Sequence, residues 1–297
     1  MRKKREFDVF GGARINESEL LSEVNIEISI LKGLDIFTNA HVVGVAKITL
    51  EICKKLNMKY DEIKKCVVAA YLHDIGKTKI APEILQKTSK LTEEEYEEMK
   101  NHTVYGYEMC MNYPTFYKYA KIVRAHHENL DGTGYPDRLR GEQIPPEASL
   151  IKVADVYDAL TQRRQYKTGF EKSEALRIML EDVKRGKMSE EYFEALVMVV
   201  LDKLEEEYNT HVINISKFEN NLEILHELEM IYKQIYDRGL TSRLERKLRK
   251  FELAPGYDMS TNARILVIKQ KALEREKELK KKCAEELKTV NKIIKKL

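Results

Sequence analysis

The sequence predicts an all-α protein, and three observations support this expectation. Breakers of regular structure are scarce, with 13 glycines and 6 prolines in 297 residues. Leucine, isoleucine, glutamate and lysine, which favour helices or tolerate them well, are abundant. No segment shows the alternation of apolar and polar residues that is typical of a strand. A fold built from helices and short loops is therefore expected.

The individual helices follow from apolar periodicity and from cap residues. A short irregular lead over residues 1–16 precedes them. Thr92, with Glu95 three residues later, predicts a capping box at one helix start. Glycine and proline gather in one loop, 128–147, and in a break at 254–260. The expected helices cover 17–33, 38–56, 61–77, 92–102, 115–127, 148–160, a segment from 173, 189–208, 211–236 and 263–297.

Composition narrows the class of protein. Hydrophobic residues make up 43% and charged residues 34%, which is typical of a globular chain rather than a disordered one. A net charge of +3 gives no reason to expect a nucleic acid polymer as partner. Four cysteines without a CxxC spacing favour a reducing, cytoplasmic location. We expect no signal peptide and no membrane span, because no apolar run reaches about 18 residues.

The last expected helix carries a narrow apolar stripe and many lysines. The stripe residues recur mostly three or four positions apart: Leu273, Leu279, Cys283, Leu287, Val290, Ile294 and Leu297. We expect this helix to pack on its own domain or to pair with a second copy, giving a homodimer. A basic surface for an acidic partner or a membrane is the alternative.

The distribution of the histidines indicates a possible metal site. The chain has seven, and five lie between residues 41 and 127, each on or at the end of an expected helix. His126 and His127 are adjacent, and neighbouring positions on a helix point about 100° apart. One metal ion could take both only where the helix ends, and the following sequence ENLDGTG provides such an end. Any single histidine here has an ordinary core or surface position as its plainest interpretation.

Two carboxylates occur in a similar context. Asp74 follows AAYLH and Asp155 follows LIKVA, so both acids come after apolar helical residues. A charged aspartate in such surroundings is costly unless a partner compensates it. Five imidazoles and two carboxylates exceed the needs of one tetrahedral zinc site. They suit two six-coordinate ions with positions left for water and substrate.

Five motifs in order resemble the HD-GYP family of bacterial phosphodiesterases. They are HxxxxA (41–46), HDIGK (73–77), His102, HHExxDGTGYP (126–136) and Asp155 in VADVYDALT. The resemblance implies an HD-type helical bundle with additional C-terminal helices. It implies three regions: an N-terminal lead and helix at 1–30, a metal-dependent phosphohydrolase domain at 31–205, and a helical extension at 206–297.

The resemblance also assigns roles to residues. It implies that one ion is held by His41, His73, Asp74 and Asp155. It implies that the second is held by Asp74, His102, His126 and His127, with Asp74 bridging the two. The catalytic residues would be Asp74 and Lys77. The substrate would contact Lys77, Arg164, Lys167 and the border formed by Gly134, Tyr135 and Pro136.

The activity implied by the resemblance is hydrolysis of cyclic di-GMP to pGpG, GMP or both. Two cations sharing an aspartate would activate a water and clamp the phosphoryl oxygens. Iron or manganese is expected, and nickel or zinc would also suit the ligand set. The alternatives are a related substrate, such as cyclic GMP-AMP, or a module that senses the dinucleotide or serves as a scaffold with little turnover.

The chain departs from the family pattern at a few positions. A glutamate that serves an extra metal in some members is Phe37 here, so two ions are expected rather than three. An arginine three residues after the first histidine is Gly44, and a proline in the basic segment is Gln165. The family usually carries a sensor or receiver domain upstream, and we expect none within residues 1–30, because this stretch is too short to form one.

Overall fold

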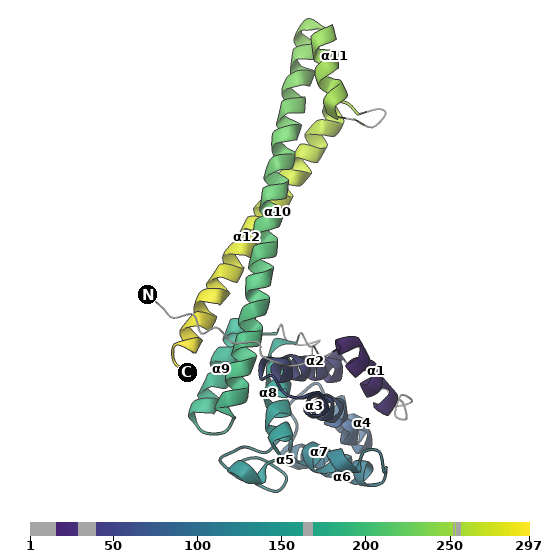
Figure 1. The fold of residues 1–297 in the computed structure, drawn as a ribbon, viewed down its shortest axis with the longest axis vertical. Helices are drawn as coiled ribbons and strands as arrows, with labels where there is room; N and C mark the ends of the chain where they lie inside the picture. Colours follow the sequence, from purple (N-terminus) through teal and green to yellow (C-terminus); the bar gives the residue numbers. More distant parts are fainter. Residues whose placement is uncertain (1–15, 29–39, 163–168, 252, 254–256) are drawn as a thin grey trace. The chain divides into compact units, whose positions relative to one another are not determined.

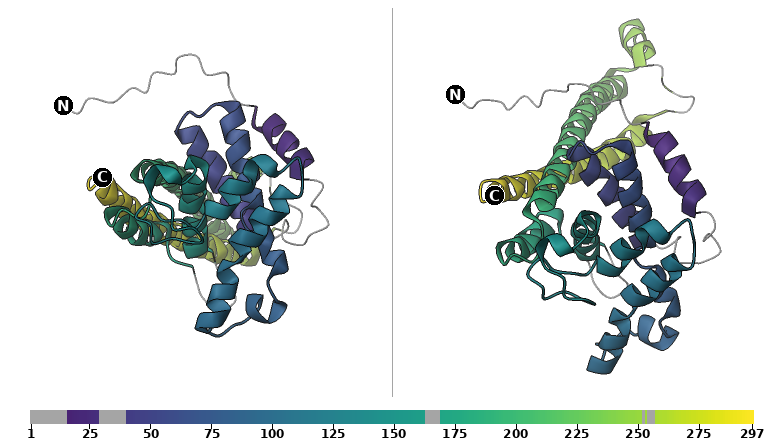
Figure 2. Two further views of the ribbon diagram at one scale, coloured as in Figure 1. Left: turned by 90° about the horizontal axis from the view of Figure 1, so that it is seen from below. Right: turned by 60° about the horizontal axis from the view of Figure 1, so that its bottom comes forward.

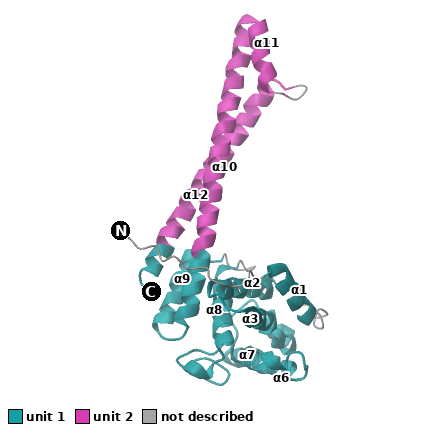
Figure 3. Cartoon of the chain, in the orientation of Figure 1, with its two compact units in different colours: residues 1–200, 290–297 teal, residues 201–289 magenta. Residues whose placement is uncertain are grey.

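The computed structural model describes residues 16–28, 40–162, 169–251, 253 and 257–297. Within these ranges every regular element is helical, and the one β-bridge joins Asp131 to Arg140. The all-α expectation is therefore confirmed. The chain forms two compact units, coloured separately in Figure 3. Unit 1 comprises residues 1–200 and 290–297, and unit 2 comprises residues 201–289.

Unit 1 is a bundle of helices, labelled in Figure 1. Helix α2 contacts α3 and α8, α3 also contacts α1 and α8, and α6 contacts α7 and the turn η3. Helices α2 and α3 lie side by side in both views of Figure 2. The elements are α1 (Glu17–Ile28), α2 (Ala40–Lys55), α3 (Tyr60–Leu72), η3 (Ile75–Lys79), α4 (Pro82–Leu85), α5 (Glu93–Lys100), α6 (His102–Met111), η4 (Tyr117–Tyr119), α7 (Ala120–Ala125), η5 (Gly141–Gln143), α8 (Pro146–Thr161), α9 (Lys172–Lys184) and the start of α10.

Helix α3 forms the centre of unit 1. Its residues Ile63, Cys66, Val67, Ala69 and Leu72 are all buried. The capping box expected at Thr92 is confirmed at the start of α5, where the Thr92 hydroxyl accepts from the amide of Glu95. All four cysteines are buried, and none of them forms a disulfide.

Three expected helices end earlier than predicted, each time at a histidine of interest. The helix over 61–77 ends at Leu72, and a separate turn begins at Ile75. The helix predicted through His102 ends at Lys100, so His102 opens α6. The helix over 115–127 is reduced to α7, which ends at Ala125. These breaks place the histidines at helix termini.

The turn after Asp74 ends the third helix because of close packing. A Cβ atom at Gly76 would lie 1.9 Å from the carbonyl oxygen of His102. Only glycine permits such an approach of two backbones. Asp74 itself takes φ −97° and ψ 6°, outside the helical range. The contact between η3 and α6 therefore requires the chain to leave the helix here.

Unit 2 is an antiparallel helical hairpin. It contains most of α10 (Glu190–Arg238), then α11 (Ser242–Leu248), η6 (Arg249–Phe251) and most of α12 (Met259–Ile294). Cys283 donates to the carbonyl oxygen of Leu204, and Asn262 donates to that of Leu225. Residues with higher numbers on α10 contact residues with lower numbers on α12, so the two helices are antiparallel.

The prediction of two helices over 189–208 and 211–236 is wrong, because α10 is continuous through Thr210. No glycine or proline interrupts residues 190–238. The Thr210 hydroxyl donates to the carbonyl oxygen of Glu206, one turn earlier. His211 is anchored by Glu276 of α12 at 2.7 Å. Contacts with α12 thus stabilise α10 in a segment whose own helix propensity is weak.

Candidate metal centre

Seven side chains from five separate elements of unit 1 converge on one point. His41 lies in the first turn of α2, His73 and Asp74 follow α3, and Asp155 lies on α8. His102 begins α6, and His126 and His127 directly follow α7. Three groups have ligand atoms within 4.8 Å of one another: His41 with His73 and Asp155, His73 with Asp74 and His126, and His102 with His126 and His127.

Helix ends orient three of the imidazoles. The Nδ1 atoms of His73, His102 and His126 lie 2.7, 2.7 and 2.6 Å from the carbonyl oxygens of Ala70, Met99 and Val123. Each of these carbonyls belongs to the last turn of a helix, where carbonyls lack the regular bond from the amide four residues later. A proton on Nδ1 satisfies the carbonyl, which leaves the Nε2 lone pair directed into the cluster.

Asp74 stands between two sets of imidazoles. Its Oδ2 atom lies 3.4 Å from Nε2 of His73 and 3.8 Å from Nε2 of His41. Its Oδ1 atom lies 3.5 Å from Nε2 of His102. Each oxygen of one carboxylate therefore faces a different group of nitrogen atoms. This is the geometry by which an aspartate joins two cations.

Several Nε2 atoms of the cluster face no hydrogen-bond donor, which indicates that cations would fit here. Nε2 of His73 is buried and has no hydrogen-bond partner. Nε2 of His102 and Nε2 of His126 lie 3.3 Å apart, although both rings use Nδ1 as the donor. Two lone pairs facing each other in a buried site repel unless a cation lies between them. The donor set of imidazoles and carboxylates suits divalent transition metals.

Burial keeps two of the imidazoles neutral, those of His126 and His127. Burial lowers the pKa of His126 well below its usual range, and burial also lowers the pKa of His127 to about 3. Burial also lowers the pKa of His41, but hydrogen bonds to Asp155 and Asp158 outweigh burial and raise this pKa to about 9. Burial alone would raise the pKa of Asp74, yet His73 and Lys77 hold it well below the usual value. For His73 burial lowers the pKa, but Asp74 raises it above the usual value. The ionised carboxylates thus favour positive charge beside them, which a bound cation would supply in place of a proton.

The cluster opens to solvent on one side. The side chains of His73 and His102 are 1% and 2% exposed, whereas those of His127 and Lys77 are 24% and 28% exposed. Lys77 Nζ lies 2.6 Å from Oδ2 of Asp74. A cationic side chain therefore borders the open edge beside the central carboxylate.

The loop that contains Gly134, Tyr135 and Pro136, here called the GYP loop, borders the same open edge of the cluster. The ring of Tyr135 lies 4.8 Å from that of His127, centroid to centroid, and a cis peptide joins it to Pro136. Two glycines of this loop serve different purposes. Gly132 has φ +79°, but Gly134 serves close packing, because its Cβ would lie 2.2 Å from the amide nitrogen of Asn129.

Three residues near the site escaped prediction. Glu128 is buried and accepts the amides of Asp137 and Leu139, so it holds the GYP loop in place. Lys152 is 3.4 Å from the carbonyl oxygen of His127, and burial lowers its pKa. Asp158 contacts His41 Nδ1 at 2.7 Å. The spacing from Asp155 to Asp158, about one helical turn, was a usable signal for the last of these.

Other expectations lie outside the described residues: the basic segment with Arg164 and Lys167, the departures at Phe37 and Gln165, and the lead before residue 16. The remaining site residues lie together or at the edge of the cluster. Their roles as ligands or substrate contacts stay predictions. No helix in the described part of the chain combines the length and the apolarity that crossing a bilayer requires.

Comparison with known proteins identifies relatives of unit 1. A family model described as HD domain matches residues 20–189. The chain is 40% identical over 139 residues to the cyclic di-GMP phosphodiesterase response regulator RpfG of Xanthomonas campestris, covering 46% of this chain and 35% of the relative. It is 30% identical over 187 residues to 3′3′-cGAMP-specific phosphodiesterase 1 of Vibrio cholerae, covering 62% and 43%.

A third relative is the cyclic di-GMP phosphodiesterase PA4108 of Pseudomonas aeruginosa, 35% identical over 171 residues, with 57% of this chain and 41% of the relative covered. The chain thus spans less than half of the length of each of these relatives. The family model matches more than half of the chain. The protein therefore belongs to the metal-dependent HD domain family, and within it to the HD-GYP group.

Proposed function

We propose that this chain is a metal-dependent phosphodiesterase that hydrolyses cyclic di-GMP to pGpG, GMP or both. The observation that carries the proposal is the carboxylate of Asp74, whose two oxygens face different groups of imidazoles. Such an arrangement suits two cations, and paired cations are a common means of hydrolysing phosphodiesters. The names of the relatives support a cyclic dinucleotide as substrate.

The residues that would hold the cations are His41, His73, Asp74 and Asp155 on one side and Asp74, His102, His126 and His127 on the other. Bound there, the cations would supply an activated water and would neutralise charge on the phosphate. Iron or manganese is the proposed metal, with nickel or zinc as alternatives. In the reaction the water oxygen bonds to phosphorus, the bond from phosphorus to the 3′ oxygen breaks, and that oxygen takes a proton.

The chain's own residues would orient the substrate. Lys77 lies beside Asp74 at the open edge, so its ammonium group would meet negative charge as it builds on the phosphate. The loop of Gly134, Tyr135 and Pro136 would border the substrate. Arg164 and Lys167 stay predicted contacts to the second phosphate, where an arginine can donate two parallel hydrogen bonds.

We further propose the division into an N-terminal segment at 1–30, the hydrolase domain at 31–205 and a helical extension at 206–297. The extension is a candidate surface for a homodimer, and truncation after Asp258 would then lower the mass measured by light scattering. An unchanged mass would contradict the dimer. A cytoplasmic location is supported by the four free, buried thiols.

The test of the activity uses the full chain, purified without oxygen. It is incubated with cyclic di-GMP and manganese or ferrous iron, and the products are separated by chromatography. We expect pGpG or GMP from the wild type and none from Asp74→Ala. Asp61→Ala, an exposed position at the start of the helix that leads to Asp74, is the matched control and should retain activity.

Two alternatives give different results in the same assay. Faster hydrolysis of 3′3′-cGAMP than of cyclic di-GMP would assign the chain the substrate printed for one of its relatives. Tight binding of a dinucleotide without product, in a protein that contains metal, would support a sensing or scaffold module. An absence of both binding and product would contradict the proposal.

A further inference from the structure

Four of the five imidazoles in the cluster have a hydrogen-bond acceptor on Nδ1, and these acceptors are of two kinds. His73, His102 and His126 each contact a backbone carbonyl three residues earlier. His41 instead contacts the carboxylate of Asp158 at 2.7 Å, across 117 residues of sequence. The difference follows from where each histidine lies along its helix.

A helix C-terminus offers free carbonyls, whereas a helix N-terminus offers free amides. His73, His102 and His126 each follow the last turn of a helix, so an acceptor for Nδ1–H is available from the same chain segment. His41 is the second residue of α2 and lies at an N-terminus. An acceptor for its Nδ1–H must therefore come from another element, and α8 provides it.

Asp158 is well placed for this task. It is 5% exposed and lies three residues after Asp155, so both carboxylates project from the same face of α8. Asp155 Oδ1 lies 3.1 Å from Nε2 of His41, and Asp158 Oδ2 lies 2.7 Å from Nδ1. The two acids thus contact opposite nitrogens of one ring, which fixes the position of the ring.

Gly44 provides the room for the Asp158 carboxylate. A Cβ at position 44 would lie 2.2 Å from Oδ1 and 2.9 Å from Cγ of Asp158. Position 44 is three residues after His41, on the same face of α2. A glycine inside a helix costs about 1 kcal/mol relative to alanine. Its presence in α2 is explained by the carboxylate that occupies the place of a side chain.

We propose that Asp158 is a positioning residue that holds His41 for one of the two cations, and that Gly44 makes its position possible. This inference rests on the proposed metal centre but not on the identity of the substrate. A carboxylate behind a ligating histidine orients the ring and makes it a better ligand. Loss of such a partner lowers metal affinity by about 10- to 100-fold.

The test measures metal content and affinity, without substrate. Wild type, Asp158→Ala, Asp158→Asn and Gly44→Ala are loaded with manganese, and content is measured by mass spectrometry during titration with a chelator. We expect two ions in the wild type. Asp158→Ala should bind one of them about 10- to 100-fold more weakly and retain the other, which His102, His126 and His127 would hold. Asp158→Asn, which can still accept a hydrogen bond, should lie between.

Gly44→Ala separates positioning from general stability. Alanine favours the helix by about 1 kcal/mol, which offsets the hydrogen bond lost by Asp158, so the metal-free variant should unfold near the wild-type temperature. Its affinity for one ion should nevertheless fall, because the new Cβ displaces the Asp158 carboxylate. Lys47→Ala, an exposed position on the same helix, is the matched control and should bind both ions like the wild type.

Three results would overturn the proposal. The first is wild-type affinity for both ions in Asp158→Ala and Gly44→Ala. The second is an equal loss of both ions with a lowered unfolding temperature, which would indicate a structural role. The third is a wild type that binds no metal. If metal binding follows the expectation but cyclic dinucleotides are not hydrolysed, the proposed function fails and the positioning role stands.

Discussion

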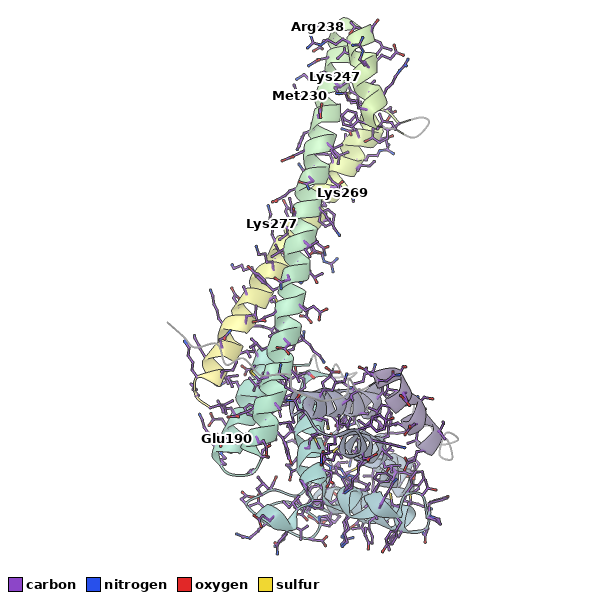
Figure 4. All side chains as sticks on the ribbon, viewed as in Figure 1. Glu190, Met230, Arg238, Lys247, Lys269 and Lys277 are labelled. Atoms are coloured by element: carbon purple, nitrogen blue, oxygen red, sulfur yellow. The ribbon has the colours of Figure 1, made fainter. Side chains whose placement is uncertain are left out.

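The two units of the chain place their charged groups in opposite ways. Unit 1 buries His73, Asp74, His102 and His126 among apolar residues. Unit 2 buries Leu222, Leu225, Leu228 and Ile231, and its ion pairs are either exposed, as between Lys277 and Glu219, or only partly buried, as between His211 and Glu276. Lys277 and Met230, on the two long helices of the hairpin, are labelled in Figure 4. Unit 1 thus has a core that cations would complete, whereas the core of unit 2 is complete with its own side chains.

Removal of the metal should have the largest effect on this contrast. With EDTA we expect unit 1 to lose about 4 kcal/mol of stability, the value for a ligand present at about 1,000 times its Kd. Unit 2 should be unchanged. Hydrogen exchange read by mass spectrometry checks this, because peptides from residues 60–160 and 201–289 report separately. Equal loss of protection in both units would contradict the contrast.

The GYP loop offers the second test, since it depends on packing rather than on metal. Gly134→Ala should destabilise unit 1 by about 3 kcal/mol, because the new Cβ would collide with the backbone of Glu128 and Asn129. Gly186→Ala is the matched control. It has φ +69° but no atom within 4 Å of the added Cβ, so it should cost only about 1 kcal/mol.

Thermal unfolding followed by circular dichroism, with metal and again with EDTA, measures both glycine variants. Equal losses at positions 134 and 186 would show that backbone angle, rather than crowding, is what matters at Gly134. The experiment also separates the loop from the cations. A loss at Gly134 that disappears in EDTA would mean that the loop acts only through the metal centre.

Sequence patterns predicted the helical class, and they singled out the seven side chains that lie together in unit 1, because those residues stand in short local motifs. The roles of these side chains as ligands stay predictions. The patterns did not predict Asp158 as the partner of His41, since that contact joins positions 117 residues apart and depends on the space at Gly44. They also missed the continuity of α10 past Thr210. There the local propensity is weak, and contacts with α12 such as His211 to Glu276 support the helix. What sequence alone could not supply is long-range packing.

The interior of the hairpin provides the third test. Leu228 is 2% exposed, and Leu228→Ala should cost about 2 kcal/mol, at the lower end for a buried leucine because two helices enclose it less fully than a large core. Ile224→Ala, one turn earlier on the same helix and 47% exposed, should cost less than about 0.5 kcal/mol. Metal content should stay at the wild-type value in both variants, and a lower content would couple the hairpin to the metal centre.

The smallest effect is expected at the surface of the hairpin, where Lys277 and Glu219 lie 3.1 Å apart and are each about half exposed. Water and salt screen such a pair, so Lys277→Ala should change stability by less than about 1 kcal/mol, and 1 M salt should remove even that difference. Chemical denaturation of the variant and the wild type at two salt concentrations measures it. The carboxylate of Asp74, by contrast, is buried, so water cannot replace a partner that it loses, and the loss is costly. A cost at Lys277 above about 2 kcal/mol, insensitive to salt, would mean that unit 2 also depends on buried charge, and the contrast between the two units would then fail.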